Sequence, residues 1–380
     1  MLQKTAAEPR VTAIPPPRDT RLDVFRALCL LSIFINHVPG QYFEYLTHKN
    51  AGFSDSAEAF VLISGLAVGL AYAPKFTAGH RLAVTVRIWR RALTLYVAHI
   101  MTSIVTLAIF AGAALYFGRP DILSEINIRP MVDHTEQGVV AMVLLGHQLG
   151  YNNILSMYAV LFLMLPGILF LMNRSMALVI VLSGLLWLVA GIGPVVPPNF
   201  MDEGYWFLNP FSWQFLFVIG IAAMVHVRRG GALPRHPALI ALAAAYVGLS
   251  FVWVVFSWWD IDLSYGLPAV LTGFDKTFLS TPRLLHVLAL AYLIAVVAPL
   301  NRAAALRIDH PLVAIGRHSL PVFIFGTILA MIGQVVVFVT DRNAPIGTAF
   351  VAAGLILHVV YARYLDAIQS LGRSRVTAPG

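Results

Sequence analysis

Residues 22–38 read LDVFRALCLLSIFINHV, an apolar run with an arginine near its start and a histidine near its end. The run is long enough to predict a membrane helix. Arg26 and His37 are eleven residues apart, which is close to three helical turns, so both side chains should share one face, roughly 16 Å apart along the axis. Polar groups inside a membrane helix are costly and usually carry function. We therefore expect this face to take part in a reaction across the membrane.

The composition indicates that this helix is one of many. The chain has 380 residues, of which 59% are hydrophobic and 12% are charged, about half the charged fraction of an ordinary soluble domain. The sequence therefore predicts an all-α, polytopic integral membrane protein. The ten expected membrane spans are residues 23–38, 57–73, 92–117, 151–172, 176–193, 211–227, 237–258, 284–300, 318–339 and 347–365.

The lysine and arginine residues predict how these spans are oriented. The formal net charge is +8, but the basic residues occupy alternate loops rather than one surface, as the positive-inside rule requires. This distribution places both termini in the cytoplasm, makes the lipid bilayer the expected partner and argues against nucleic acid. The residues that follow the rule are Lys4, Arg10, Arg18, Arg21, Lys75, Arg81, Arg87, Arg90, Arg91, Arg174, Arg228, Arg229, Arg235, Arg302, Arg307, Arg363, Arg373 and Arg375.

The remaining segments complete the predicted organisation. Residues 1–21 are expected to form a disordered cytoplasmic tail, residues 22–365 a single transmembrane domain, and residues 366–380 a second cytoplasmic tail. Residues 139–149 are apolar but too short to cross a bilayer. We expect them to form a short interfacial or re-entrant helix on the outer side.

Several kinds of site have no basis in the sequence. The single cysteine, Cys29, lies within the first apolar run, so the chain can form no internal disulfide and offers no cysteine metal site. Neither a nucleotide-binding glycine loop nor an HExxH zinc motif is present. We expect no bound metal and no permanently bound cofactor.

His37 is the first candidate for chemistry. On the predicted topology it lies at the outer end of the first helix, where Pro39 and Gly40 end the helix. A neutral imidazole can accept a proton from a hydroxyl group and return it, as acyl or proton transfer requires. The alternative is a structural histidine at the membrane interface. Asn36 could stabilise an oxyanion or orient a substrate, or it could pack as an ordinary polar residue.

The second predicted helix opens on the same outer face with GFSDSAEAFVLISG, residues 52–65. Asp55 is placed to cap this helix, and it is also a candidate for substrate contact. Glu58 follows one turn deeper, where a buried carboxylate needs a partner. We expect that partner to be His37, held by Glu58 as a catalytic base is held by an orienting group. Gly65 lies deeper and predicts close helix packing.

Basic residues gather at the cytoplasmic start of the third helix. Arg87, Arg90 and Arg91 stand there, and the Arg-x-x-Arg spacing places Arg87 and Arg90 on one helical face, which suits phosphate groups. The alternative is that these arginines only orient the helix in the membrane.

Aromatic and amide residues gather in the outer loops. Asn152, Trp213 and Gln214 lie at the outer starts of their predicted helices. Such residues suit a carbohydrate, because sugar faces stack on aromatic rings and hydroxyl groups hydrogen-bond to amides. The alternative for most of them is an interfacial aromatic belt that anchors the protein.

Taken in order, these motifs resemble a known family. Arg26-x10-His37, the run FVLISG at residues 60–65, and Arg87-x-x-Arg90 resemble the acyltransferase-3 superfamily. Asn36-His37-Val-Pro-Gly40, residues 52–58 and the run NPFSWQ at residues 209–214 are similar to the OpgC family, which succinylates osmoregulated periplasmic glucans in Gram-negative bacteria. The resemblance covers about residues 20–365.

The resemblance implies an inner-membrane O-acyltransferase with a tunnel. Acyl-CoA, as succinyl-CoA first and acetyl-CoA second, would enter from the cytoplasm and bind its phosphates at Arg26, Arg87, Arg90 and Arg91. The thioester would reach His37, which would serve as general base or as a transiently acylated residue, and a periplasmic glucan hydroxyl would accept the acyl group. The rival interpretation is a glycan or solute transporter without covalent chemistry.

Overall fold

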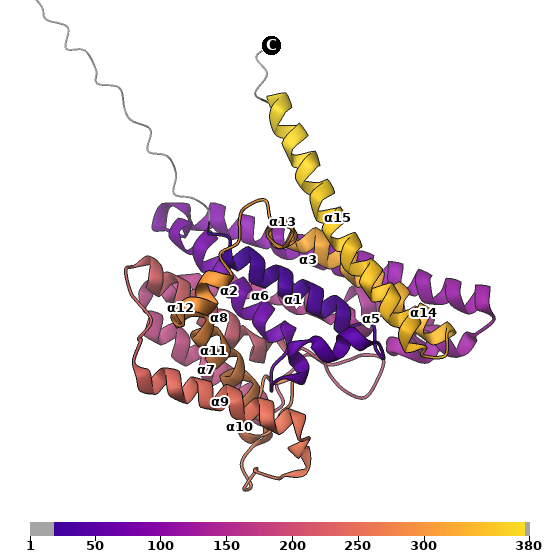
Figure 1. Ribbon diagram of the computed structural model, residues 1–380, viewed down its shortest axis with the longest axis horizontal. Coiled ribbons are helices and arrows are strands. Elements are labelled where there is room, and N and C mark those ends of the chain that lie inside the picture. Colours follow the sequence, from indigo (N-terminus) through magenta and orange to yellow (C-terminus); the bar gives the residue numbers. More distant parts are fainter. Residues whose placement is uncertain (1–18, 377–380) are drawn as a thin grey trace, which may run out of the picture.

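The computed structural model describes residues 19–376 of the chain (Figure 1), so nearly all of the predicted tail at residues 1–21 lies outside the described residues. Within them the secondary structure is helical, with short 3-10 turns and no strand. The long helices are α1 (Arg21–Asn36), α2 (Ser56–Ala71), α3 (Arg81–Phe117), α6 (Asn153–Arg174), α7 (Met176–Ile192), α8 (Pro210–Arg228), α9 (Pro237–Val255), α11 (Thr281–Val296), α14 (Ser319–Val339) and α15 (Ala344–Val376). The short helices are α4 (Arg129–Asp133), α5 (Thr135–Val143), α10 (Ala269–Thr272), α12 (Ala298–Ala303) and α13 (Pro311–Arg317).

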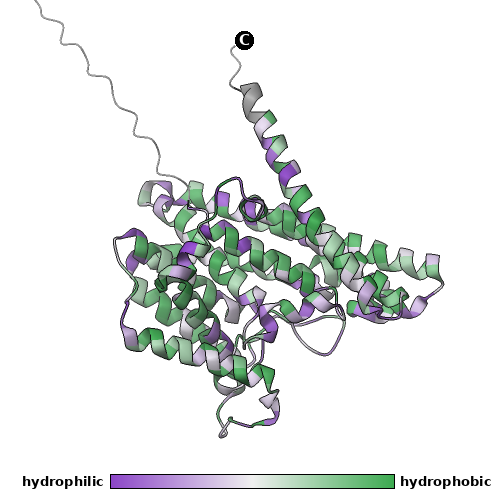
Figure 2. Ribbon diagram, in the orientation of Figure 1, coloured by the Kyte–Doolittle hydropathy of each residue, from purple (hydrophilic) through white to green (hydrophobic). Residues whose placement is uncertain are grey.

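The all-helical membrane architecture is confirmed. Each of the ten predicted spans coincides with one of the long helices. Seven helices of the described chain are long and apolar enough to cross a membrane, and α7 and α11 are shorter apolar helices. Figure 2 shows hydrophobic residues along most helices, whereas hydrophilic residues gather in the loops and in the last part of α15. The count of ten spans and the side of each terminus remain predictions.

Several boundaries differ from the prediction. The expected helix at residues 139–149 ends at Val143, because Leu145 adopts a left-handed backbone with φ of 62° and the chain turns there. The expected span at 284–300 breaks at Val297, whose extended backbone precedes a proline at the start of α12. The last helix continues beyond residue 365 as far as Val376, so the start of the predicted second tail is helical. This part of α15 projects from the bundle (Figure 1).

Close packing of α2 against α8 forms the centre of the bundle. Gly65 of α2 faces Gly220 of α8, and a Cβ atom built on Gly65 would lie 2.3 Å from the carbonyl oxygen of Phe217. The absence of a side chain lets the two helix backbones touch, as the sequence predicted for Gly65. Large side chains fill the space around this contact, and Trp213 and Phe217 of α8 are completely buried.

Replacing Gly65 by alanine is expected to destabilise the bundle. The added methyl group would overlap backbone atoms of α8 that cannot move aside, and overpacking of this kind costs roughly 1–3 kcal/mol. The midpoint of thermal unfolding in detergent should fall. Gly248→Ala in α9 is the matched control, because a Cβ atom there meets no atom within 4 Å. Equal midpoints for both variants would contradict the close α2–α8 contact.

Candidate functional site

His37 sits directly after the last residue of α1, as the C-cap of that helix, and is partly buried. Its imidazole ring stacks on Tyr151, with 4.0 Å between ring centroids and 23° between the planes. Gln334 of α14 donates from Nε2 to the carbonyl oxygen of His37 at 2.9 Å. The Nδ1 atom of His37 is buried and has no hydrogen-bond partner within residues 19–376. Stacking therefore fixes the ring while leaving a nitrogen open for proton transfer.

A cavity of about 240 Å³ lies beside this ring. His37 and Asn36 line it from α1, and Asp55 lines it from the start of α2. Two lysines, Lys49 and Lys276, complete its charged wall. The structure thus brings the predicted residues His37, Asn36 and Asp55 together around one enclosed space.

Glu58 does not have the partner that the sequence predicted. Its carboxylate is completely buried. Arg283 of α11 donates to it from Nε at 2.7 Å, and Nη2 of the same guanidinium lies 2.5 Å from it in an ion pair. Glu58 also accepts from the backbone N–H of Asp55 at 2.9 Å, which completes a capping box at the start of α2. The predicted Glu58–His37 pair is therefore wrong, because a full ion pair and a helix cap already occupy the carboxylate.

Asp55 joins the same charged network from outside the helix. Its carboxylate pairs with Lys276 and lies 3.4 Å from Nη2 of Arg283, while it also accepts from the backbone N–H of Ala57. Burial raises the pKa of the Asp55 carboxyl, but the positive charges of Lys276 and Arg283 outweigh burial and hold it below its ordinary value. Asp55 is therefore an ionised residue that fixes the lysine beside the His37 cavity.

Sequence reasoning missed both cations of this network. Lys276 lies 221 positions from Asp55, and Arg283 lies 225 positions from Glu58. The segment before α11 brings Lys276, and the first turn of α11 brings Arg283, to the start of α2. The only signal in the sequence is the buried acidic pair itself, which required partners without identifying them.

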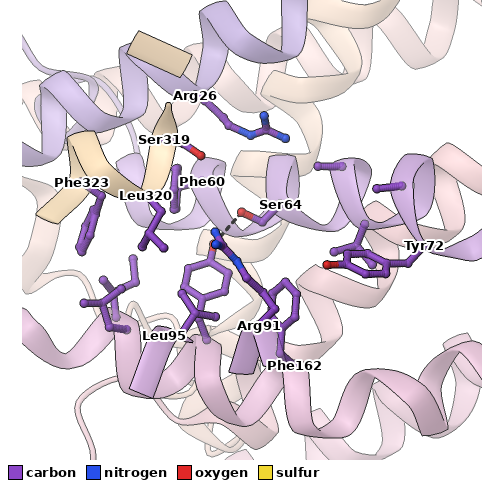
Figure 3. Close-up of a pocket in the computed structure, with 16 residues that line it drawn as sticks. Arg26, Phe60, Ser64, Tyr72, Arg91, Leu95, Phe162, Ser319, Leu320 and Phe323 are labelled. Atoms are coloured by element: carbon purple, nitrogen blue, oxygen red, sulfur yellow. Dashed lines mark hydrogen bonds between the residues drawn. The ribbon is translucent and has the colours of Figure 1, made fainter. Parts of the chain in front are cut away.

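A second cavity, of about 370 Å³, lies toward the other end of α1 (Figure 3). Arg26 of α1 and Arg91 of α3 line it, together with Ser64 of α2. The hydroxyl group of Tyr158 donates to Ser64 at 3.0 Å across the middle of the cavity. Arg26 is also paired with Asp23, Nη1 to Oδ1, at 3.3 Å.

The structure separates the predicted arginines into two pairs. Arg26 and Arg91 belong to the cavity of Figure 3, whereas Arg87 and Arg90 are exposed and do not line it. All three arginines of the cluster lie inside α3, which begins at Arg81 rather than after them. Helical geometry explains the division, because Arg91 is rotated by about 100° from Arg90, and Arg87, on nearly the same face as Arg91, lies about 6 Å nearer the start of α3.

The two cavities meet at one residue of α6. Ile154 lines both the cavity with Arg26 and Arg91 and the cavity with His37. Along α1 the side chains at the two cavities, Arg26 and His37, are separated by about 16 Å at 1.5 Å per residue. The predicted alignment of a cation and a titratable histidine is therefore matched by two adjoining spaces in the bundle.

Three predicted substrate residues make hydrogen bonds within the fold. Asn152 is completely buried and donates from Nδ2 to Thr106 of α3 at 3.1 Å. Gln214 donates to the carbonyl oxygen of Ser183 at 2.8 Å and so joins α8 to α7. Trp213 is buried and donates from Nε1 to the carbonyl oxygen of Lys276 at 3.1 Å. None of these three side chains lines the His37 cavity, and Trp213 acts on it only by positioning the backbone of Lys276.

The described residues also bear on metal binding and on the other histidines. Within residues 19–376 no group of three or more His, Cys, Asp and Glu side chains could hold a metal ion.

Two other histidines, His286 and His99, are buried in α11 and α3. His286 Nδ1 lies 2.7 Å from Ser54 Oγ, and His99 Nδ1 lies 3.0 Å from the carbonyl oxygen of Asn152. Their Nε2 atoms are, like Nδ1 of His37, buried without a hydrogen-bond partner among the described residues, but of the three rings only that of His37 lines the cavity with Lys49 and Lys276.

A comparison with models of known protein families identifies one family that matches this chain. The family model described as OpgC protein matches residues 18–370, which include α1, both cavities and nearly all of α15. No individually curated protein matches the chain. Because the match extends over almost the whole chain, the family assignment made from the sequence is confirmed. The chain belongs to the OpgC family of membrane acyltransferases.

Proposed function

We propose that this protein transfers an acyl group from cytoplasmic acyl-CoA to a hydroxyl group of a periplasmic glucan across the inner membrane. Succinyl-CoA is the first donor and acetyl-CoA the second. The observation that carries the proposal is the adjoining pair of cavities, one with Arg26 and Arg91 and the other with His37, which share Ile154. A transporter needs a path for the whole solute, whereas a route past Ile154 would have to admit only the thin arm of an acyl donor.

The donor is proposed to enter at the arginine end. Arg26 and Arg91 would bind the phosphate groups through charge-assisted hydrogen bonds. Arg87 and Arg90, exposed earlier on α3, would meet phosphates that remain outside the cavity. The pantetheine arm is long enough to pass Ile154 and bring the thioester to the ring of His37.

The proposed reaction at His37 needs only acyl-CoA and the glucan hydroxyl group as reactants. His37 accepts the proton of the glucan hydroxyl as the oxygen attacks the thioester carbon, and the carbon–sulfur bond then breaks. The departing thiolate recovers the proton from the imidazolium, which releases CoA and leaves the acyl ester on the glucan. Asn36, whose Oδ1 lies 2.8 Å from Thr47 Oγ1, presents its amide N–H groups for the oxyanion. In the alternative route His37 attacks the thioester carbon and the CoA thiolate leaves. The glucan hydroxyl then attacks the acyl-histidine, which frees the imidazole, and the hydroxyl proton neutralises the thiolate.

Two lysines beside His37 favour a succinyl donor. Lys49 and Lys276 line the same cavity as His37, and each has one acidic partner, Glu44 and Asp55 respectively. An ammonium group has three donors, so each lysine keeps capacity for a second carboxylate. The free carboxylate of a succinyl group would find these donors, whereas an acetyl group would leave them unused.

The experiment that tests this function is release of CoA by purified protein in detergent. We expect faster release from succinyl-CoA than from acetyl-CoA, and stimulation by added periplasmic glucan with formation of a glucan ester. Preference for acetyl-CoA would overturn the succinyl assignment. Absence of release and of ester with both donors, from correctly folded protein, would overturn the enzyme and favour the transporter.

Removing the charge of Arg91 is expected to weaken donor binding. A charge-assisted hydrogen bond contributes about 1.5–3 kcal/mol, so Arg91→Met should raise the KM for acyl-CoA by roughly 10- to 100-fold with a smaller effect on kcat. Arg228→Met is the matched control, because Arg228 is exposed at the end of α8 and lines neither cavity. Equal KM values for both variants would show that the phosphates bind elsewhere.

A further inference from the structure

We propose that a third cavity, of about 440 Å³, is the binding site for the neutral carbohydrate that accepts the acyl group. This inference rests on the proposed function, because it places the acceptor of that reaction. The loops after α5 and α7 form most of the cavity, together with the segment before α4. The residues predicted from the sequence to bind substrate do not line it. We call it the acceptor cleft.

The acceptor cleft is a direct neighbour of the reactive histidine. It shares three lining residues, Tyr151, Asn153 and Phe207, with the cavity beside His37. Tyr151 is the residue whose ring stacks on His37 at 4.0 Å. Gln334 also lines the cleft while it donates to the carbonyl oxygen of His37. A hydroxyl group held in the cleft therefore has a short path to the imidazole.

The chemistry of the cleft wall suits a sugar. Amide side chains line it from three separate segments, at Asn127, Gln148 and Asn199, and each amide can both donate and accept hydrogen bonds as a hydroxyl group requires. Tyr205 and Phe207 stand at its side with 47% and 51% of their surface exposed. Exposed aromatic rings beside amides are the arrangement on which the apolar face of a sugar ring can stack.

The few ionisable residues that line the acceptor cleft favour a neutral ligand. Within the described residues the lining contains one carboxylate, Glu125, and one histidine, His147, but no lysine or arginine. The ring of His147 is already engaged, with Nε2 2.8 Å from the carbonyl oxygen of Asn127 and Nδ1 3.3 Å from Oδ1 of Asn199. A phosphate or an acyl-CoA would meet no cation in this cleft, which distinguishes it from the cavity of Arg26 and Arg91.

Gln148 identifies the part of the cleft that needs a ligand. Both Oε1 and Nε2 of its side chain are buried, and neither has a hydrogen-bond partner among residues 19–376. A buried amide without partners is costly, so such groups are normally satisfied by a ligand or by water. A pair of sugar hydroxyl groups can satisfy both atoms at once, one as donor and one as acceptor.

The backbone around Gln148 is held in a preformed shape. Phe200 donates from its backbone N–H to the carbonyl oxygen of Gly146 at 2.7 Å, and its ring occupies the space that a side chain on Gly146 would need. Ile126 and Asn127 adopt left-handed backbone angles, with φ of 47° and 62°, that direct the carbonyl of Asn127 to His147. The three loops are thus joined before any ligand binds, which lowers the entropic cost of binding.

The test is direct binding of glucan in the absence of acyl-CoA. The probe is a neutral periplasmic glucan extract, titrated into purified protein in detergent by calorimetry. We expect saturable binding that weakens at least about tenfold in Gln148→Ala and in Tyr205→Ala, consistent with the loss of one or two hydrogen bonds or of a stacking surface. Tyr265→Ala is the matched control, because Tyr265 is an aromatic residue that is 85% exposed and does not line the cleft.

The outcomes separate this inference from the proposed function. Binding that is equal in wild type, Gln148→Ala and Tyr205→Ala would overturn the acceptor cleft even if acyl transfer occurs. Binding that weakens only in the two cleft variants would support the cleft even if neither acyl-CoA donor is consumed. If Gln148→Ala fails to fold, Tyr205→Ala decides, because Tyr205 is largely exposed and its removal disturbs little packing.

Discussion

His37→Ala is expected to lower the rate of glucan acylation by about 10²- to 10⁴-fold, which is the usual contribution of a general acid–base group. Alanine can neither accept the proton of the hydroxyl group nor return one to the leaving thiolate. The KM for acyl-CoA should change little, because the donor binds through the arginine cavity. Initial rates of ester formation, measured with equal amounts of folded protein, provide the test.

His134→Ala is the control for this experiment. His134 is an exposed histidine between α4 and α5 and lines neither the His37 cavity nor the acceptor cleft. Its replacement should leave the rate unchanged. A His37→Ala protein that retains a rate within a few-fold of wild type would exclude His37 as the base. Isolation of an acyl-enzyme from wild type, and not from the variant, would favour the acyl-histidine route.

Glu58→Gln is expected to cause the largest loss of stability. The Glu58 side chain is completely buried and Arg283 has only 14% of its side chain exposed, so the change leaves a buried guanidinium without its main counter-charge. Breaking one partner of a buried ion pair costs about 3–5 kcal/mol. Unfolding of the purified protein in detergent, by heat or by denaturant, should show a clear decrease in the midpoint.

The double variant Glu58→Gln/Arg283→Met identifies the cause. If the ion pair is responsible, the double variant should lose less stability than the sum of the two single variants, because neither charge is then left alone. Glu136→Gln, an exposed carboxylate in the first turn of α5, is the control and should have little effect. Additive losses, or a Glu58→Gln protein as stable as wild type, would contradict the pairing of Glu58 with Arg283.

The fold was largely predictable because the membrane imposes simple rules. Apolar length and the spacing of charges are local properties, and they identified every long helix near its observed position. The errors occurred in segments whose structure depends on contacts with residues far away in the sequence. The helix expected at residues 139–149 stops at Val143, and the rest of that segment forms a wall of the acceptor cleft through Gln148. An apolar composition cannot reveal a turn that depends on contacts with other loops.

The site was predictable only in part, for a related reason. His37, Asn36 and Asp55 lie near one another in the sequence and were expected on the same outer face, and the structure brings them to one cavity. Glu58 was assigned the nearest polar neighbour, whereas its true partner, Arg283, is 225 positions away. Trp213 was expected to contact substrate, but burial turns its N–H toward the backbone of Lys276. Side-chain partners across such distances depend on the packing of helices that spacing alone does not determine.

The central claim is that one route carries an acyl group from the arginine cavity to His37 across the membrane. Proteoliposomes with periplasmic glucan sealed inside and labelled succinyl-CoA added only outside test it directly, with His37→Ala proteoliposomes as control. We predict labelled ester on the enclosed glucan and free CoA in the external medium, and neither with the variant. Ester that forms only when donor and glucan are supplied on the same side of the membrane would contradict the account.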